Sequence, residues 1–283
     1  MKLRPVGTLA VVVSVLLAAA SARGNTAEQA FASGEALLAK ADFQGALQAF
    51  ATAARADRAN QQYLQHFAMV QQVIAMRSSL LAEKNPERWE YTARGLHSFY
   101  IGQGLYEEAL ALDEQMHSRL NTTTSATLLA ETQLAMNLNA EAAQTLSTLD
   151  LNKQTAATRA LAGLALARQG KLDDARQVAG AIQLASDASP GELYSAARLQ
   201  AAVGNQEGAL QLLTICFESL APSRLEALKD HARQSPDFVS LASTEAFAQV
   251  LKTESKVAES KCSGGSRCAG CPMRGSCPSS QGH

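Results

Sequence analysis

Apolar side chains recur every three to four residues along most of the chain, which is the spacing of one face of an α-helix. The longest such strip is 61–83, and its broad apolar face carries Tyr63, Phe67, Val70, Ile74 and Leu81. Prolines are few and leave long stretches free to stay helical. The pattern therefore predicts an all-α fold.

The breaks between the expected helices contain capping residues. Asn85 precedes Pro86, which is the order of an N-cap followed by the first helical position. Gly170 ends another expected helix, and Asp173 and Asp174 begin the next one, where carboxylates favour the helix dipole. We expect two more helices between Ser223 and Leu251, which would cap the last apolar face.

Small residues recur at a nearly constant interval. Gly34 lies twelve residues before Ala46, as Gly163 lies twelve before Ala175. A series with intervals of 34, 32 and 34 residues is formed by Ala109, Ala143, Ala175 and Ala209. Two helices can cross at short distance only where Gly or Ala leaves the backbone bare. The interval predicts helical hairpins with these residues at the crossings.

This frame is similar to the tetratricopeptide repeat family, whose unit of about 34 residues is a helix, a turn and a second antiparallel helix. Its best copies are at 27–60, around Gly163 and around Ala209. His97 and Glu131 depart from the family's preference for small residues. The resemblance implies a right-handed superhelical stack of hairpins, because a single hairpin cannot bury its own apolar face.

Four segments follow from these features. They are a signal peptide at 1–22, repeats at 23–220, capping helices at 221–255, and a tail rich in Cys, Gly and Ser at 256–283. Lys2 and Arg4 precede an uncharged stretch that closes on small residues at Ala22, which is the order of a cleavable signal peptide. We expect a periplasmic or secreted protein without stable membrane insertion after cleavage. The alternative is an uncleaved N-terminal membrane anchor.

Composition narrows the classes of partner. The chain has 283 residues, 47% of them hydrophobic and 18% charged, with a formal net charge of −1. A nucleic-acid binder usually carries a large basic excess, so nucleic acid is not an expected partner. We expect a protein or peptide partner instead.

The candidate partner-binding residues lie on the first helices of the hairpins, which line the concave face in such a stack. They are Phe31, Tyr91, Arg94, Ser98, Arg168, Tyr194 and Arg198. Arginines and tyrosines together suit a peptide that carries carboxylates. The sequence thus predicts a protein–protein interaction scaffold, although each of these side chains could also be an ordinary packing or solvated residue.

The tail carries the strongest chemical signal. Its cysteines follow a C-x5-C-x2-C-x5-C pattern and are Cys262, Cys268, Cys271 and Cys277. Two disulfides are one reading for an exported protein. The alternatives are a Zn²⁺ site with four thiolates, an iron–sulfur cluster, thiol exchange and a simple reduced tail. The alternative function is therefore a metal-binding or thiol–disulfide appendage carried on the repeats.

The remaining residues give little support for catalysis. The five histidines are scattered without the spacing of metal ligands. The chain has no P-loop, no GxSxG turn and no GxGxxG after a strand. Cys216 lies on an apolar helical face and is expected to be inert core. We therefore expect no enzymatic activity and no cofactor, apart from a possible Zn²⁺ in the tail.

Overall fold

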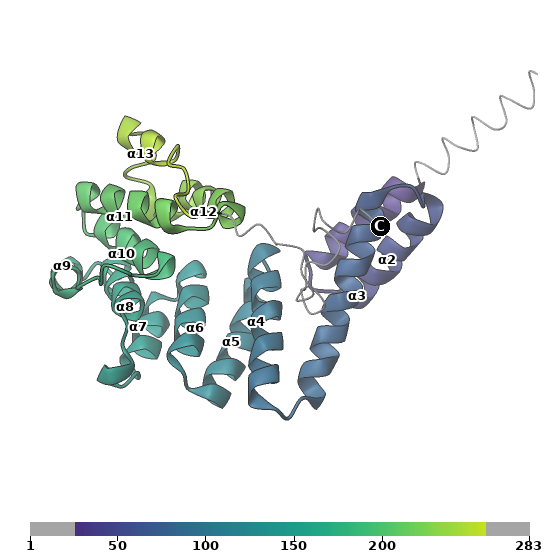
Figure 1. Ribbon diagram of the computed structural model, residues 1–283. Coiled ribbons are helices and arrows are strands. Elements are labelled where there is room, and N and C mark those ends of the chain that lie inside the picture. The colour runs from purple at the N-terminus through teal and green to yellow at the C-terminus, as the bar shows by residue number, and fades with distance from the viewer. Residues whose placement is uncertain (1–25, 259–283) are drawn as a thin grey trace, which may run out of the picture. The chain divides into compact units, whose positions relative to one another are not determined.

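The computed structural model describes residues 26–258, and all regular elements in that range are helices (Figure 1). No β-strand occurs within it. The predicted all-α class is therefore confirmed for the described residues. The chain divides into two compact units, one ending at Leu149 and the other beginning at Asp150.

The first unit is a succession of helices, each packed against the next. It begins with a helix at 26–38, and the labelled helices that follow are α2 (Phe43–Ala56), α3 (Gln61–Ala82), α4 (Pro86–Gly102), α5 (Tyr106–Leu120), α6 (Thr123–Ala135) and α7 (Asn139–Ser147). From α2 onward, each helix contacts its successor in the chain. This order agrees with helical hairpins that stack, and α3 matches the long helix predicted from the apolar pattern.

The second unit is organised around α10. Its elements are η1 (Leu151–Lys153), α8 (Ala156–Arg168), α9 (Leu172–Ala181), α10 (Pro190–Ala202), α11 (Gln206–Ser219), α12 (Pro222–Gln234), η2 (Pro236–Phe238) and α13 (Glu245–Val250). Helix α10 packs against α8 and α11 (Figure 1). It also packs against the short turn η2. The segment predicted to cap the last hairpin is thus helical, and it is broken between α12 and η2.

The caps follow the predicted chemistry. The side chain of Asn85 accepts a hydrogen bond from the backbone N–H of Arg88 at 3.0 Å, and Pro86 is the first residue of α4. Gly170 has φ +80° in the turn between α8 and α9, a backbone conformation that residues other than glycine rarely adopt.

Within residues 26–258, no helix is both long and apolar enough to span a bilayer.

The small residues lie at close crossings, as predicted. A Cβ atom on Gly34 would be 2.6 Å from the Phe50 ring, and one on Gly163 would be 2.8 Å from Leu199. The alanines predicted at the crossings are also fully buried, namely Ala46, Ala109, Ala175 and Ala209.

The prediction for the hairpin that contains α7 is wrong by one residue. Ala142 is fully buried, whereas Ala143 is only half-buried. The buried series from Ala109 to Ala175 therefore runs at even intervals of 33 residues.

Candidate functional site

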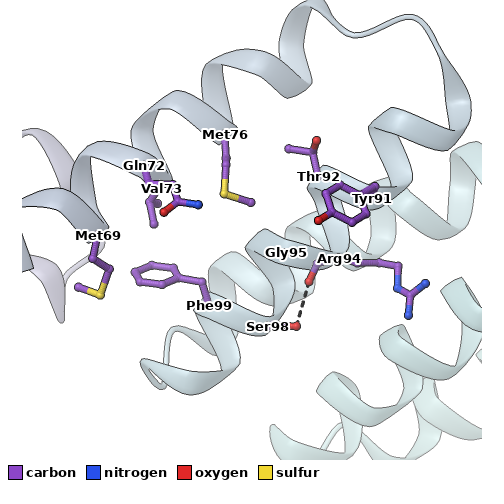
Figure 2. Close-up of a pocket in the computed structure, with 10 residues that line it drawn as sticks. All are labelled: Met69, Gln72, Val73, Met76, Tyr91, Thr92, Arg94, Gly95, Ser98 and Phe99. Atoms are coloured by element: carbon purple, nitrogen blue, oxygen red, sulfur yellow. Dashed lines mark hydrogen bonds between the residues drawn. The ribbon is translucent and has the colours of Figure 1, made fainter. Parts of the chain in front are cut away.

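An open groove lies between α3 and α4 in the first unit (Figure 2). Its volume is about 710 Å³, within the range of sites that hold small ligands or a few side chains of a partner. Helix α3 contributes Met69, Gln72, Val73 and Met76. Helix α4 contributes Tyr91, Thr92, Arg94, Gly95, Ser98 and Phe99.

The groove follows from helical spacing on both walls. Met69, Val73 and Met76 are four and three residues apart, so they share one face of α3. Gly95 leaves the facing surface of α4 bare, and a Cβ atom there would be 2.7 Å from the terminal methyl of Met76. Because Gly95 has no side chain, the terminal methyl of Met76 can lie close to the backbone of α4.

The groove is apolar inside and carries a single positive charge. Figure 2 shows the methionine side chains and the Phe99 ring in the space between the helices, with the Arg94 guanidinium turned away from them. The hydroxyls of Thr92 and Ser98 donate hydrogen bonds to carbonyls of their own helix, each at 3.0 Å. Of the ten lining residues, only Arg94 is charged, so no carboxylate lines the groove.

Three of the seven predicted partner-binding residues are accessible in this groove. Tyr91 is 79% exposed, and Arg94, one helical turn later, is also exposed. Ser98 follows Arg94 on the same face of α4. The repeat frame therefore identified the α4 wall of the groove, but it gave no indication of the α3 wall, because α3 falls in a shortened repeat.

Phe31 was predicted to lie on the partner-binding surface, but it is buried in the structure. Its ring centroid lies 5.4 Å from that of Phe50 and 4.9 Å from that of Tyr63, inside the core of the first unit. An aromatic ring at this crossing gains more from burial than from exposure on an open face. Phe31 is therefore a packing residue and does not lie on an accessible surface.

Two of the other three predicted residues, both arginines, are a second correction, because they bind the chain's own Asp237. The Nη2 atom of Arg168 lies 2.7 Å from Oδ1 of Asp237, and Nε of Arg198 lies 2.7 Å from Oδ2. The Asp237 side chain is only 3% exposed. Tyr194 is buried beside this cluster. The carboxylate expected from a partner is thus supplied by η2, which is 69 residues from Arg168 in sequence.

Tyr194 is held by His231 of α12. The Tyr194 hydroxyl lies 2.7 Å from Nδ1 of His231. Burial lowers the pKa of His231; the positive charge of Arg198 acts in the same direction, and Asp237 opposes it. The neutral ring is therefore favoured at pH 7, and its Nδ1 can accept the tyrosine proton in a hydrogen bond.

A buried polar cluster in the first unit joins α4, α5 and α6. The Nδ1 atom of His97 lies 2.8 Å from Oδ1 of Asp113, and the Thr132 hydroxyl donates to Oδ2 at 2.6 Å. The hydroxyl and the imidazole both bind the carboxylate, so no nucleophile–base pair is formed by these three residues. His97 thus stands at a position where a small residue was expected because it pairs with Asp113.

Cys216 is buried in the core of the second unit, as predicted. Its thiol donates to the carbonyl oxygen of Pro190 at 3.2 Å, and burial raises the pKa of the thiol to about 12. The cysteines of the tail lie outside the described residues, so their disulfide, metal and thiol readings stay predictions. Between residues 26 and 258, no cluster of three or more His, Cys, Asp or Glu side chains could hold a metal ion.

The environment of Cys216 gives a testable expectation. Alkylation of the native chain by iodoacetamide near neutral pH should modify Cys216 on the order of a thousandfold more slowly than in the unfolded chain, because so little thiolate is present. Peptide mass spectrometry of native and denatured samples measures this ratio. Equal rates in the two samples would mean that the thiol is accessible.

No protein-family model and no curated protein matches the chain.

Proposed function

We propose that the protein is a non-enzymatic protein-interaction scaffold whose groove between α3 and α4 receives a segment of a partner protein. The observation that carries this proposal is the groove itself, which is apolar inside and open to solvent, with Tyr91 exposed at its edge. Exposed apolar surface bordered by polar residues is typical of interaction sites. No catalytic group lies among its lining residues in an arrangement that activates a nucleophile.

The side chains of the groove suit a protein ligand. Met69 and Met76 are flexible and polarisable, so they can adapt to the shape of an inserted side chain. Tyr91 offers a large ring with a polar tip, and Tyr is enriched at protein interfaces. From Met69 to Met76 the wall rises about 10 Å, or roughly two helical turns. A short segment with one or two apolar anchors fits this length.

We also propose that the hairpins are tetratricopeptide repeats and that the protein acts after export. The first proposal is supported by the buried small residues at intervals of 33 to 34 residues between Ala109 and Ala209. The second is supported by the order of charged, uncharged and small residues at 1–22, which lie outside the described range.

Panning a phage-displayed random-peptide library on the immobilised full chain tests the proposed function. A selected peptide should lose more than about tenfold in affinity when Gly95 is replaced by leucine, because the new side chain fills the groove. The fold should survive, since the clashing atom is the flexible end of Met76 and leucine favours the helix over glycine.

The matched control is Gly102→Ala in the same helix, where a Cβ atom would meet nothing within 4 Å. Its affinity for the peptide should equal that of the parent chain. The proposal is wrong if the library yields no saturable binder, or if Gly95→Leu and Gly102→Ala bind the selected peptides equally well.

A further inference from the structure

We infer, on the basis of the proposed function of the groove, that it selects a partner segment in which a carboxylate stands next to an aromatic side chain. The chain itself contains such a pair, Asp237 and Phe238, bound against α10 of the second unit. The positions of α10 that hold this pair correspond to positions of α4 that line the open groove.

The correspondence rests on the buried alanines. Arg94 stands fifteen residues before Ala109, and Tyr194 stands fifteen residues before Ala209. Both alanines are fully buried on the second helix of their hairpins. The next position along this face is one helical turn later, and it is Ser98 in α4 and Arg198 in α10. Arg94 and Ser98 of α4 therefore stand at the positions that Tyr194 and Arg198 occupy in α10.

In the second unit this stripe holds an acid and a ring. The Nε atom of Arg198 donates to Oδ2 of Asp237 at 2.7 Å. The ring of Phe238 packs against that of Tyr194 with centroids 5.8 Å apart in an edge contact. Phe238 is 1% exposed, and Tyr194 and Arg198 are 7% and 8% exposed, so this face is buried in the second unit. In α10 this stripe therefore binds a carboxylate through Arg198 and contacts a ring through Tyr194.

In the first unit the corresponding stripe is open. Arg94 is exposed, and within the described residues its guanidinium forms no ion pair or hydrogen bond. An arginine without a carboxylate partner favours an anionic group on an incoming ligand, and planar guanidinium and carboxylate groups pair by two hydrogen bonds. The groove therefore complements a negatively charged residue at its Arg94 side.

The apolar side of the groove complements an aromatic ring. Thioether sulfurs make favourable contacts with ring edges, and Met69 and Met76 both line this side together with Phe99. Arg94 is turned away from these three side chains (Figure 2). A ligand must therefore direct its carboxylate toward Arg94 and its ring toward the methionines. Adjacent residues of an extended segment point to opposite sides and meet this requirement.

Fluorescence polarisation with a labelled peptide of residues 233–243 tests this inference on the full chain. The peptide contains the Asp237–Phe238 pair, and we expect saturable binding. Replacing that aspartate by asparagine in the peptide should weaken binding about tenfold, as should replacing its phenylalanine by alanine. In the protein, Arg94→Gln should weaken binding of the parent peptide about tenfold and should leave binding of the asparagine peptide unchanged.

The matched control is Arg88→Gln, which removes an exposed arginine of α4 that does not line the groove. It should bind the parent peptide like the unaltered chain. Insensitivity to Arg94→Gln would mean that the peptide binds elsewhere, for example by displacing the chain's own η2, and would overturn the inference. Failure of the parent peptide to bind would overturn it as well.

The two proposals fail in different ways. One outcome is that peptides selected from the random library bind in a way that Gly95→Leu blocks, while replacing the aspartate of the 233–243 peptide by asparagine has no effect. In that case the groove is a binding site without the inferred selectivity. If the selected peptides are also indifferent to Gly95→Leu, the proposed function of the groove is wrong.

Discussion

Replacing Asp237 with alanine is expected to lower the free energy of unfolding of the second unit by about 3–5 kcal/mol. The Asp237 carboxylate is 3% exposed and binds both Arg168 and Arg198, whose side chains are 15% and 10% exposed. Its removal takes away a carboxylate that two largely buried guanidinium groups share. Urea unfolding followed by circular dichroism measures the loss.

The matched control is Asp230→Ala, seven residues earlier. Asp230 pairs with Arg233 on the exposed surface of α12, and such a pair contributes about 0.5 kcal/mol or less. Equal effects of the two substitutions would contradict the view that the buried cluster holds η2 against α8 and α10.

Replacing Phe50 with alanine is expected to destabilise the first unit by about 3–5 kcal/mol. The Phe50 ring is fully buried and lies against the bare backbone at Gly34. Gly34→Leu alone should cost about 1–3 kcal/mol, because its side chain has no space beside the ring. The double variant should be more stable than the sum of the single effects by about 1–2 kcal/mol, since the leucine enters the cavity that the ring leaves.

Thermal unfolding of the four proteins of this cycle measures the coupling. Leu81→Ala serves as the control for loss of an apolar side chain, because Leu81 is 90% exposed and should contribute little. Additive effects of Phe50→Ala and Gly34→Leu would show that the two residues do not share one crossing, and the assignment of small residues to helix crossings would be wrong at that hairpin.

The helices and their crossings could be predicted because their causes are local. An apolar face repeats within a few residues, and caps such as Asn85 act on their own helix. The frame failed by one residue at α7, where adjacent alanines Ala142 and Ala143 offer the same small side chain. Only the packing of neighbouring helices determines which of the two is buried.

The roles of the predicted site residues depended on distant partners. Arg168 and Arg198 were expected to bind a carboxylate of a partner, but both bind Asp237 of the same chain, which lies in the turn after α12. Nothing in the spacing of the chain indicates that contact. Tyr91 and Arg94 stayed accessible because no segment of the described chain covers that side of α4.

The α3 wall of the groove could not be predicted from the repeat frame. Met69 and Met76 belong to a long helix in a shortened repeat, with 63 residues instead of about 68 between Ala46 and Ala109, so the frame assigned them no face. A bare position on the neighbouring helix, Gly95, was the one available signal, because glycine within a helix is costly unless close packing uses it.

Hydrogen–deuterium exchange of the full chain, with and without a peptide selected from the library, tests whether the groove between α3 and α4 is the peptide-binding site. We expect the peptide to slow exchange in 69–76 and 91–99, the two walls of the groove, and to leave α8 to α11 unchanged. Protection confined to other helices, with both walls exchanging at their original rates, would contradict it.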